Sequence, residues 1–457
     1  MDIDGELAAA SREELLAIIV ELRERLAEHE ATIVRLREVE AELQGRVASL
    51  EARLGGRGAG PLPGNKPGPA EPAAAKRPKK RRPKGFARAR LTPTERVGHA
   101  VETCPDCGTH LVGGWVQRTR EVIEVPVVPV QVVEHVFIAR ECPLCRKRWV
   151  AKVALGEVVA GQQRLGVNLV SLIVTLREEG RLPFRTIQWY LATFHQLQLS
   201  LGGIAHVVQQ VAKRAEPAVE TIREQIRGSP VVHADETGWR ESGKNGYAWT
   251  YSTKTERYFL RRGRHKGVVD EVLGPTFAGV LVSDFYAAYD HYPGVHQRCW
   301  THLLRAIHDL TALYPDDAGL AKWAAAVHAL YAEAKAFVSP DERERRRAQL
   351  RYERRLLARC RPFLGDPLAV QGRLCRRIQR FIKQLFVFVR IPAVPPDNNA
   401  AERSLRPLVT SRKISGGTRS EPGTTTKMTL ASFFGTCRAR GLNPFHECRR
   451  LLISPQT

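Results

Sequence analysis

Three acidic residues of this sequence stand in contexts that can bring carboxylates to one site. Asp235 ends the apolar run that begins at Val231, and Asp284 ends a second β-rich apolar run at 279–284. Glu402 follows an Asp-Asn-Asn segment, whose residue types favour helix N-termini. A single strand-end aspartate is more often a turn residue, but three such acids in a very basic chain favour a joint role.

The chemistry that such acids support is metal-dependent. Carboxylates are hard ligands for Mg²⁺ or Mn²⁺, and two such ions about 3.5–4 Å apart can hold the attacking and leaving oxygens of a phosphodiester. We therefore predict a two-metal site for phosphoryl transfer at Asp235, Asp284 and Glu402.

Glu236 directly follows Asp235, but the alternation of side chains along a strand separates it from this site. In a strand over 231–236, His233 and Asp235 share one face and Glu236 lies on the other. We expect Glu236 to face away, with a supporting role as the less favoured alternative. The residues themselves assign no role to His233.

Four motifs carry a resemblance to a known family. They are His-Ala-Asp-Glu-Thr-Gly at 233–238, Leu-Val-Ser-Asp-Phe-Tyr-Ala-Ala-Tyr at 281–289, Arg-Cys-Trp-Thr-His-Leu-Leu-Arg at 298–305 and Asp-Asn-Asn-Ala-Ala-Glu-Arg at 397–403. Together they resemble the DDE transposases of the insertion sequence 66 family, and the likeness covers nearly the whole chain. It implies an RNase H-like core with Asp235, Asp284 and Glu402 as the metal-binding acids.

The resemblance also implies an activity and partners. The expected reactions are cleavage of DNA at transposon ends and strand transfer into target DNA. Such elements often carry companion reading frames, which implies accessory proteins as partners. Roles for Thr237, Asn398 and Asn399 in shaping the site through hydrogen bonds rest mainly on this resemblance.

Composition favours a nucleic-acid partner. The 71 Lys and Arg residues exceed the 48 Asp and Glu residues, which gives a formal charge of +23. A basic but passive surface is the alternative. The N-terminus lacks the pattern of a signal peptide, and no apolar run approaches the roughly 18 residues that span a bilayer. We expect no membrane association and a cytoplasmic, nucleoid-associated protein.

The N-terminal part predicts self-association followed by a DNA tether. Apolar residues repeat in heptads over 12–54, which predicts a coiled coil and a homo-oligomer; an amphipathic helix folded back on its own domain is the alternative. Residues 55–95 form a Pro/Gly-rich basic linker. Its expected DNA-binding residues are Lys79, Lys80, Arg81 and Arg82, with a merely solvated tail as the alternative.

Two Cys-x-x-Cys pairs predict a zinc ribbon over 96–155. Their thiols belong to Cys104, Cys107, Cys142 and Cys145, and an alternating β-like stretch at 122–137 lies between the pairs. Four thiolates form a closed, structural Zn²⁺ site. A redox dithiol is the less favoured alternative, because two matched pairs are one more than redox chemistry needs.

The next region, 160–227, is expected to be helical. Segments 185–195 and 204–214 flank a short Leu-Gly-Gly turn, which is compatible with a helix-turn-helix that reads DNA ends. Because helical pairs with short turns are common, DNA reading and simple packing remain equally open.

The catalytic domain is predicted over 228–450. Strands are expected at 247–252 and 257–261. The segment 238–245 nearly matches a phosphate-binding loop, but Asn245 replaces the metal-binding hydroxyl and Asn-Gly at 245–246 indicates a hairpin turn, so ATP binding is rejected.

An Arg-rich helical insertion with basic faces for DNA is expected at about 300–395. At its start, Cys299, Trp300 and His302 invite a metal interpretation. A packed structural motif is favoured, because no second pair of ligands is near in the sequence.

The helix expected to begin at Glu402 should end or kink at Pro407. Basic residues just past the acid are predicted to hold DNA; they are Arg403, Arg406, Arg412 and Lys413. A last helix from about 425 to 440, stopped by Gly441 and Pro444, should close the domain.

The predicted fold class is therefore multidomain α+β: a coiled coil, a zinc ribbon, a helical region and an RNase H-like α/β core with a helical insertion. Two functional alternatives stay open. One is a non-catalytic zinc-ribbon DNA-binding protein with a relic nuclease core, and the other is a nuclease that cuts without joining.

Overall fold

The computed structural model describes residues 11, 12, 20, 26, 29, 90–125, 128–159 and 163–454. Contacts divide the chain into two units, Met1–Ile123 and Glu124–Thr457, and each is described by itself. Apart from the few residues named above, the predicted coiled coil at 12–54 lies outside the described residues. So do most of the linker and its Lys79, Lys80, Arg81 and Arg82.

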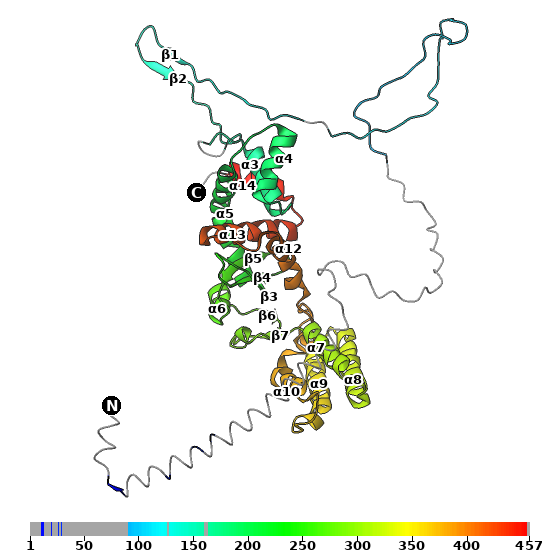
Figure 1. Ribbon diagram of the computed structural model, residues 1–457, viewed down its shortest axis with the longest axis vertical. Coiled ribbons are helices and arrows are strands. Elements are labelled where there is room, and N and C mark those ends of the chain that lie inside the picture. The colour runs from blue at the N-terminus through cyan, green and yellow to red at the C-terminus, as the bar shows by residue number, and fades with distance from the viewer. Residues whose placement is uncertain are drawn as a thin grey trace. The chain divides into compact units, whose positions relative to one another are not determined.

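A mixed five-stranded sheet forms the centre of the second unit (Figure 1). Its strands are β3 (Val231–Gly238), β4 (Tyr247–Ser252), β5 (Arg257–Arg262), β6 (Val280–Ser283) and β7 (His296–Arg298), in the order β5-β4-β3-β6-β7. The first three form an antiparallel meander, while β6 pairs in parallel with β3 and β7 in parallel with β6. A mixed helix and sheet architecture agrees with the predicted α+β class.

The two faces of the sheet have different covers. On one face, Val232, Ala234 and Trp249 pack with Ile222 and Ile226 of α5 (Leu201–Arg227). The short helices α6 (Gly267–Leu273) and η1 (Ala287–Tyr289) complete this side. On the other face, Ala248 and Phe259 meet α12 (Asn399–Ser415) and α13 (Glu421–Ala439).

The loop between β3 and β4 contains no helix start, which a phosphate-binding loop would require. Glu241 and Lys244 exchange two backbone hydrogen bonds across Ser242 and Gly243, whose φ angles are 48° and 77°. Two consecutive positive φ angles are typical of a tight hairpin turn. The turn therefore lies at Ser242-Gly243, and the prediction that Asn245-Gly246 forms it was wrong by three residues.

Helices on either side of the catalytic region share one core. They are α3 (Val167–Glu178), α4 (Phe184–His195), α5, α13 and α14 (Pro444–Ile453). The predicted Leu-Gly-Gly turn was wrong, because Leu201-Gly202-Gly203 is the first turn of α5. Ser200 caps this turn by accepting a hydrogen bond from the Gly203 N–H, and the break lies at Gln196, where φ is 54°.

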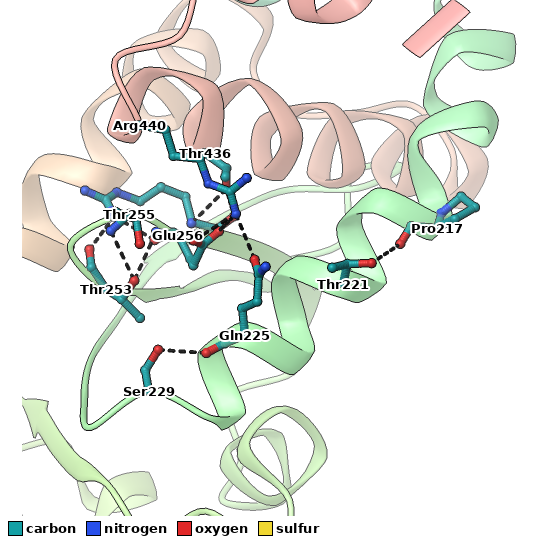
Figure 2. Close-up of polar contacts among 10 residues, drawn as sticks. Pro217, Thr221, Gln225, Ser229, Thr253, Thr255, Glu256, Thr436 and Arg440 are labelled. Atoms are coloured by element: carbon teal, nitrogen blue, oxygen red, sulfur yellow. Dashed lines mark hydrogen bonds and ion pairs between the residues drawn. The ribbon is translucent and has the colours of Figure 1, made fainter. Parts of the chain in front are cut away.

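Polar contacts attach the C-terminal end of α13 to the sheet and to α5 (Figure 2). Arg440 donates to both carboxylate oxygens of Glu256, in the β4–β5 turn, and to Oε1 of Gln225 in α5. Thr436 Oγ1 accepts from the Arg257 N–H at 3.0 Å. These bonds hold together segments about 180 to 215 residues apart in the sequence.

The region between β7 and α12 is the predicted helical insertion. It contains α7 (Trp300–Leu313), α8 (Ala318–Ala336), α9 (Glu342–Cys360), η2 (Arg361–Phe363), α10 (Gly372–Phe381), η3 (Ile382–Gln384) and α11 (Val387–Arg390). These helices bury a core of their own, in which Trp300, Tyr352 and Phe386 take part. Contacts of η3 and α11 with β7 place the insertion at that edge of the sheet (Figure 1).

Two helix boundaries differ from the predictions. The helix that carries Glu402 begins at Asn399 and continues through Pro407 to Ser415. The last predicted helix begins at Glu421, where Ser420 caps it and Pro422 occupies the first turn, and α14 follows it. In the first turn of a helix the backbone N–H has no partner within the helix, so a proline there costs no hydrogen bond. This explains the earlier start.

The predicted strands between the cysteine pairs are absent from the described part of 122–137. Short strands occur instead at β1 (Ala139–Glu141) and β2 (Arg148–Val150), which pair antiparallel. In the part of the chain that the structure describes, no helix is long and apolar enough to cross a membrane.

Candidate active site

Asp235 and Asp284 come to the same edge of the sheet. Strands β3 and β6 run in parallel, and His233 lies opposite Val282. Asp235 and Asp284 each come two residues after this pair, so both lie at the same end of the two strands. Asp235 Oδ1 accepts from the Glu236 N–H at 2.9 Å. Asp284 Oδ1 accepts from the Tyr286 N–H, also at 2.9 Å, which fixes the side chain at the start of the loop.

A buried arginine holds the backbone of this second acid. The Arg298 side chain is fully buried, and its guanidinium donates to the carbonyl oxygen of Asp284 at 2.6 Å. The same group forms an ion pair with Asp290 at 2.5 Å and donates to Gln384 Oε1 at 2.9 Å. Arg298 therefore ties the Asp284 loop to the insertion, a role that its place in the sequence motif did not predict.

Asn398 positions the third acid. This buried side chain donates to the Ala234 carbonyl at 2.7 Å, and its Oδ1 lies 3.1 Å from Nδ1 of His233. The Asn398 N–H meets Sγ of Cys299 at 3.2 Å. The N-terminus of α12 is thus anchored to β3, and Glu402 in its first turn lies beside Asp235.

The three carboxylates influence one another electrostatically. Withdrawal from water, together with the negative charges of Glu236, Asp284 and Glu402, raises the pKa of Asp235 to about 8. Oε1 of Glu402 is buried without a hydrogen-bond partner in the described structure. Crowded carboxylates and an unsatisfied acceptor oxygen fit a divalent cation, whose charge would offset their repulsion.

The side chains as they stand are not in a ligating arrangement. Among the described residues, no group of three or more His, Cys, Asp or Glu side chains could hold a metal ion in its present geometry. The Glu402 carboxylate lies near His302, whose Nε2 is 3.9 Å from Oε1, longer than a hydrogen bond.

Glu236 lies on the opposite face from Asp235, as the alternation of the strand predicts. Its carboxylate accepts from the Tyr289 hydroxyl at 2.8 Å and pairs with Arg264 at 2.9 Å. Burial, followed by the charge of Asp284, raises the pKa of Glu236. The side chain is only 4% exposed, so its part in the site is electrostatic.

The segment that begins at Cys299 divides into two roles. Cys299 and Trp300 are buried, and burial raises the pKa of the Cys299 thiol, which suits a packed neutral group. His302 lies three residues on, on the same helix face, and points to Glu402. Reasoning from the sequence missed this contact, because His302 and Glu402 lie on different helices, far apart in the sequence.

The predicted DNA-binding residues of α12 differ in their surroundings. Arg403, Arg406 and Lys413 are exposed. Arg412 is partly buried and donates to Thr237 Oγ1 at 3.0 Å and to the carbonyl oxygen of Gly238. Its guanidinium therefore joins α12 to the end of β3. Asn399 contributes a backbone N–H to Asp397 at 3.1 Å.

Both cysteine pairs adopt the same local backbone structure. The Cys104 N–H donates to the Thr109 carbonyl, and the Gly108 N–H to the Cys104 carbonyl. In the other unit, Cys142 makes the same two bonds, with Lys147 and Arg146. Gly108 and Arg146 both have positive φ angles, 73° and 58°. Hydrogen bonds lower the thiol pKa of Cys107, through Thr109, and of Cys142, through Cys145, which favours thiolates.

Comparison with known proteins gives two matches. Residues 162–426, more than half of the 457-residue chain, match the family described as "Transposase IS66 family". The chain is also 38% identical over 74 residues to the "Uncharacterized protein y4jO" of Sinorhizobium fredii (strain NBRC 101917 / NGR234). That similarity covers 16% of this chain and 23% of the relative, so the chain spans less than a quarter of the relative's length.

Proposed function

Because the chain belongs to the IS66 family of transposases, we propose that it is a DDE transposase, which cuts DNA at transposon ends and joins those ends to target DNA. Family membership itself gives a function in transposition. The observation that carries the finer proposal is the convergence of Asp235, Asp284 and Glu402 from two parallel strands and one helix.

The strand order supports an RNase H-like core. The first acid lies on the central strand, β3, between an antiparallel meander and a parallel strand that delivers the second acid. The helical insertion separates the second acid from the third in sequence, and α12 returns Glu402 to β3. This arrangement agrees with the core that the motifs imply.

In the proposed mechanism, Asp235, Asp284 and Glu402 would hold two Mg²⁺ or Mn²⁺ ions. When bound, such ions activate the attacking oxygen and stabilise the leaving oxygen of a phosphodiester. Water first attacks the phosphodiester at the transposon end and releases a 3′-hydroxyl. That hydroxyl then attacks a target phosphodiester, so one bond forms for each bond that breaks.

Other residues of the chain position these acids. Arg298 fixes the Asp284 loop, Asn398 fixes the start of α12, and His302 is placed to orient Glu402. Exposed Arg403, Arg406 and Lys413 are proposed to contact DNA phosphates beside the site. We propose, in addition, that the four cysteines hold one structural Zn²⁺ and that the 12–54 heptads make the protein a homo-oligomer.

The test is an assay of purified protein on DNA that carries a transposon end, with Mg²⁺ or Mn²⁺ added. Cleaved and joined products are expected together, because both steps use one site. Cleavage without joining would favour the nuclease alternative. DNA binding with neither product, also after addition of the element's companion proteins, would favour the non-catalytic DNA-binding protein.

A further inference from the structure

One helix of the insertion presents a row of arginines. In α10, Arg373, Arg376, Arg377 and Arg380 follow the three- and four-residue spacing that places side chains on one helix face. Arg377 is partly buried and the other three are exposed. The opposite face is buried in the core of the insertion; its residues are Leu374, Cys375 and Ile378.

This row faces the loop that follows Asp284. The four arginines, together with Phe285, Ala287 and Asp290, line a cavity of about 350 Å³. Phe285 and Ala287 are one and three residues past the second acid. The Arg377 guanidinium lies over the Phe285 ring, 5.6 Å from its centroid. The positive wall therefore begins directly beside the candidate active site.

The positive charge of this wall is not balanced locally. Asp290 is the one carboxylate among the lining residues, and it already pairs with Arg298 at 2.5 Å and with Arg380 at 2.7 Å. Within the described part of the chain, Arg373, Arg376 and Arg377 form no ion pair. Three guanidinium groups on one face are thus available to an external anion.

We propose that Arg373, Arg376 and Arg377, here called the α10 arginine face, bind consecutive phosphates of the DNA strand whose reacting phosphate lies at Asp284. The inference rests on the proposed function, because that function puts DNA at Asp284. The guanidinium fork matches phosphate oxygens in geometry. Arginine side chains are long and flexible, so guanidinium groups spread over the rise of about 6 Å from Arg373 to Arg377 can reach neighbouring phosphates of one strand.

The experiment measures binding of the full-length protein to a fluorescein-labelled duplex without added Mg²⁺ or Mn²⁺, over a range of salt concentrations. The test variant is Arg373→Gln/Arg376→Gln/Arg377→Gln. Its matched control is Arg343→Gln/Arg347→Gln/Arg354→Gln, which removes three exposed arginines from α9 of the same insertion. Glutamine keeps the helix propensity, and unchanged thermal unfolding verifies the fold of both variants.

We expect the dependence of log Kd on log salt to become shallower by about 2–3 units in the test variant, at about 0.9 unit per lost phosphate contact. The control should change by less than about 1 unit. A third variant with lysine at the same three α10 positions keeps the charge and should retain most of the wild-type slope. Equal changes in the test variant and the control, or no change in either, would overturn the proposal. The second result would leave an acidic protein as the partner of this face.

Separate measurements of DNA binding and of catalysis distinguish this proposal from the proposed function. A wild-type protein that neither cuts nor joins DNA, also with the companion proteins added, would remove the transposase proposal; the expected loss of binding would then leave the α10 arginine face as a DNA contact of a non-catalytic protein. Cutting and joining that proceed equally in the wild type and the test variant would support the transposase and refute the face.

Discussion

At the scale of residues, the site concentrates negative charge. Asp235 lies in the field of three other acids, and among the described residues Glu236 is the one of these that pairs with an arginine, Arg264. Because the folded state raises the pKa of Asp235, its ionisation opposes folding. Its contribution to stability is complete below its unfolded pKa of about 4 and is lost as the pH rises toward about 8.

The first prediction follows from the raised pKa of Asp235. Without added Mg²⁺ or Mn²⁺, Asp235→Asn should stabilise the protein by about 2–4 kcal/mol near pH 8 and by much less near pH 5. The measurement is thermal unfolding at the two pH values. Exposed Asp316→Asn, in the turn between α7 and α8, is the control and should show no such difference. Destabilisation by Asp235→Asn of equal size at both pH values would contradict the pKa argument.

At the scale of elements, helices 249 residues apart in the sequence depend on one another. Lys427 of α13 and Glu178 of α3 form an ion pair of 2.7 Å, and their side chains are only 9% and 4% exposed. Such a pair stabilises little compared with apolar residues, but the loss of one partner leaves a buried charge. The pair therefore connects α3, in the helical region before the sheet, to α13, which covers the sheet.

The second prediction concerns this ion pair. Lys427→Met should lower the free energy of unfolding by about 3–5 kcal/mol, because it leaves Glu178 buried and unpaired. The double variant Glu178→Gln/Lys427→Met should recover much of that loss. Denaturant unfolding of Lys427→Met, Glu178→Gln and the double variant measures the coupling between the two residues. A single-variant loss under about 1 kcal/mol would mean that water reaches the pair.

Elements with a strong local pattern could be predicted from the sequence, and contacts between distant elements could not. The apolar runs ending at Asp235 and Asp284 indicated β3 and β6, and their faces followed from alternation. In contrast, the Arg298 and Asn398 contacts join residues up to 165 positions apart, so no local pattern contains them.

Predictions from helix-breaking residues also failed where tertiary structure offset the cost of a glycine or proline in a helix. Gly202 and Gly203 belong to the first turn of α5 because the Ser200 side chain caps it. Pro407 stays inside α12 because Leu405 and Leu408 on either side of it pack against the sheet. Tertiary packing can override helix propensity, even for an interior proline, whose cost is about 3 kcal/mol.

At the scale of the whole molecule, the proposed reaction needs two DNA ends held together, which favours a multivalent protein. The parts that would provide this are the 12–54 heptads and the basic linker, while the insertion and its α10 arginine face lie beside the acids. Each part is proposed to add a DNA or protein contact that a minimal nuclease core lacks.

The third prediction tests the oligomer. Removal of residues 1–54 should convert a self-associated protein into a smaller species, since the heptad seam supplies the apolar contact. Light scattering coupled to size-exclusion chromatography measures the mass. Leu22→Glu/Leu36→Glu/Leu43→Glu in the full chain should give the same change, because it places charges in the seam. An unchanged mass in both variants would assign self-association to another part of the chain.

The central claim is that Asp235, Asp284 and Glu402 act together on a phosphodiester. Its most direct measurement is strand transfer from a precut, labelled transposon end with Mg²⁺ or Mn²⁺, for the wild type and for Asp235→Asn, Asp284→Asn and Glu402→Gln. Each variant should lose about 100-fold or more of the joined product, because metal ligation supplies several kcal/mol to the transition state, while DNA binding persists. Wild-type levels of joining in any one of the three variants would contradict the account.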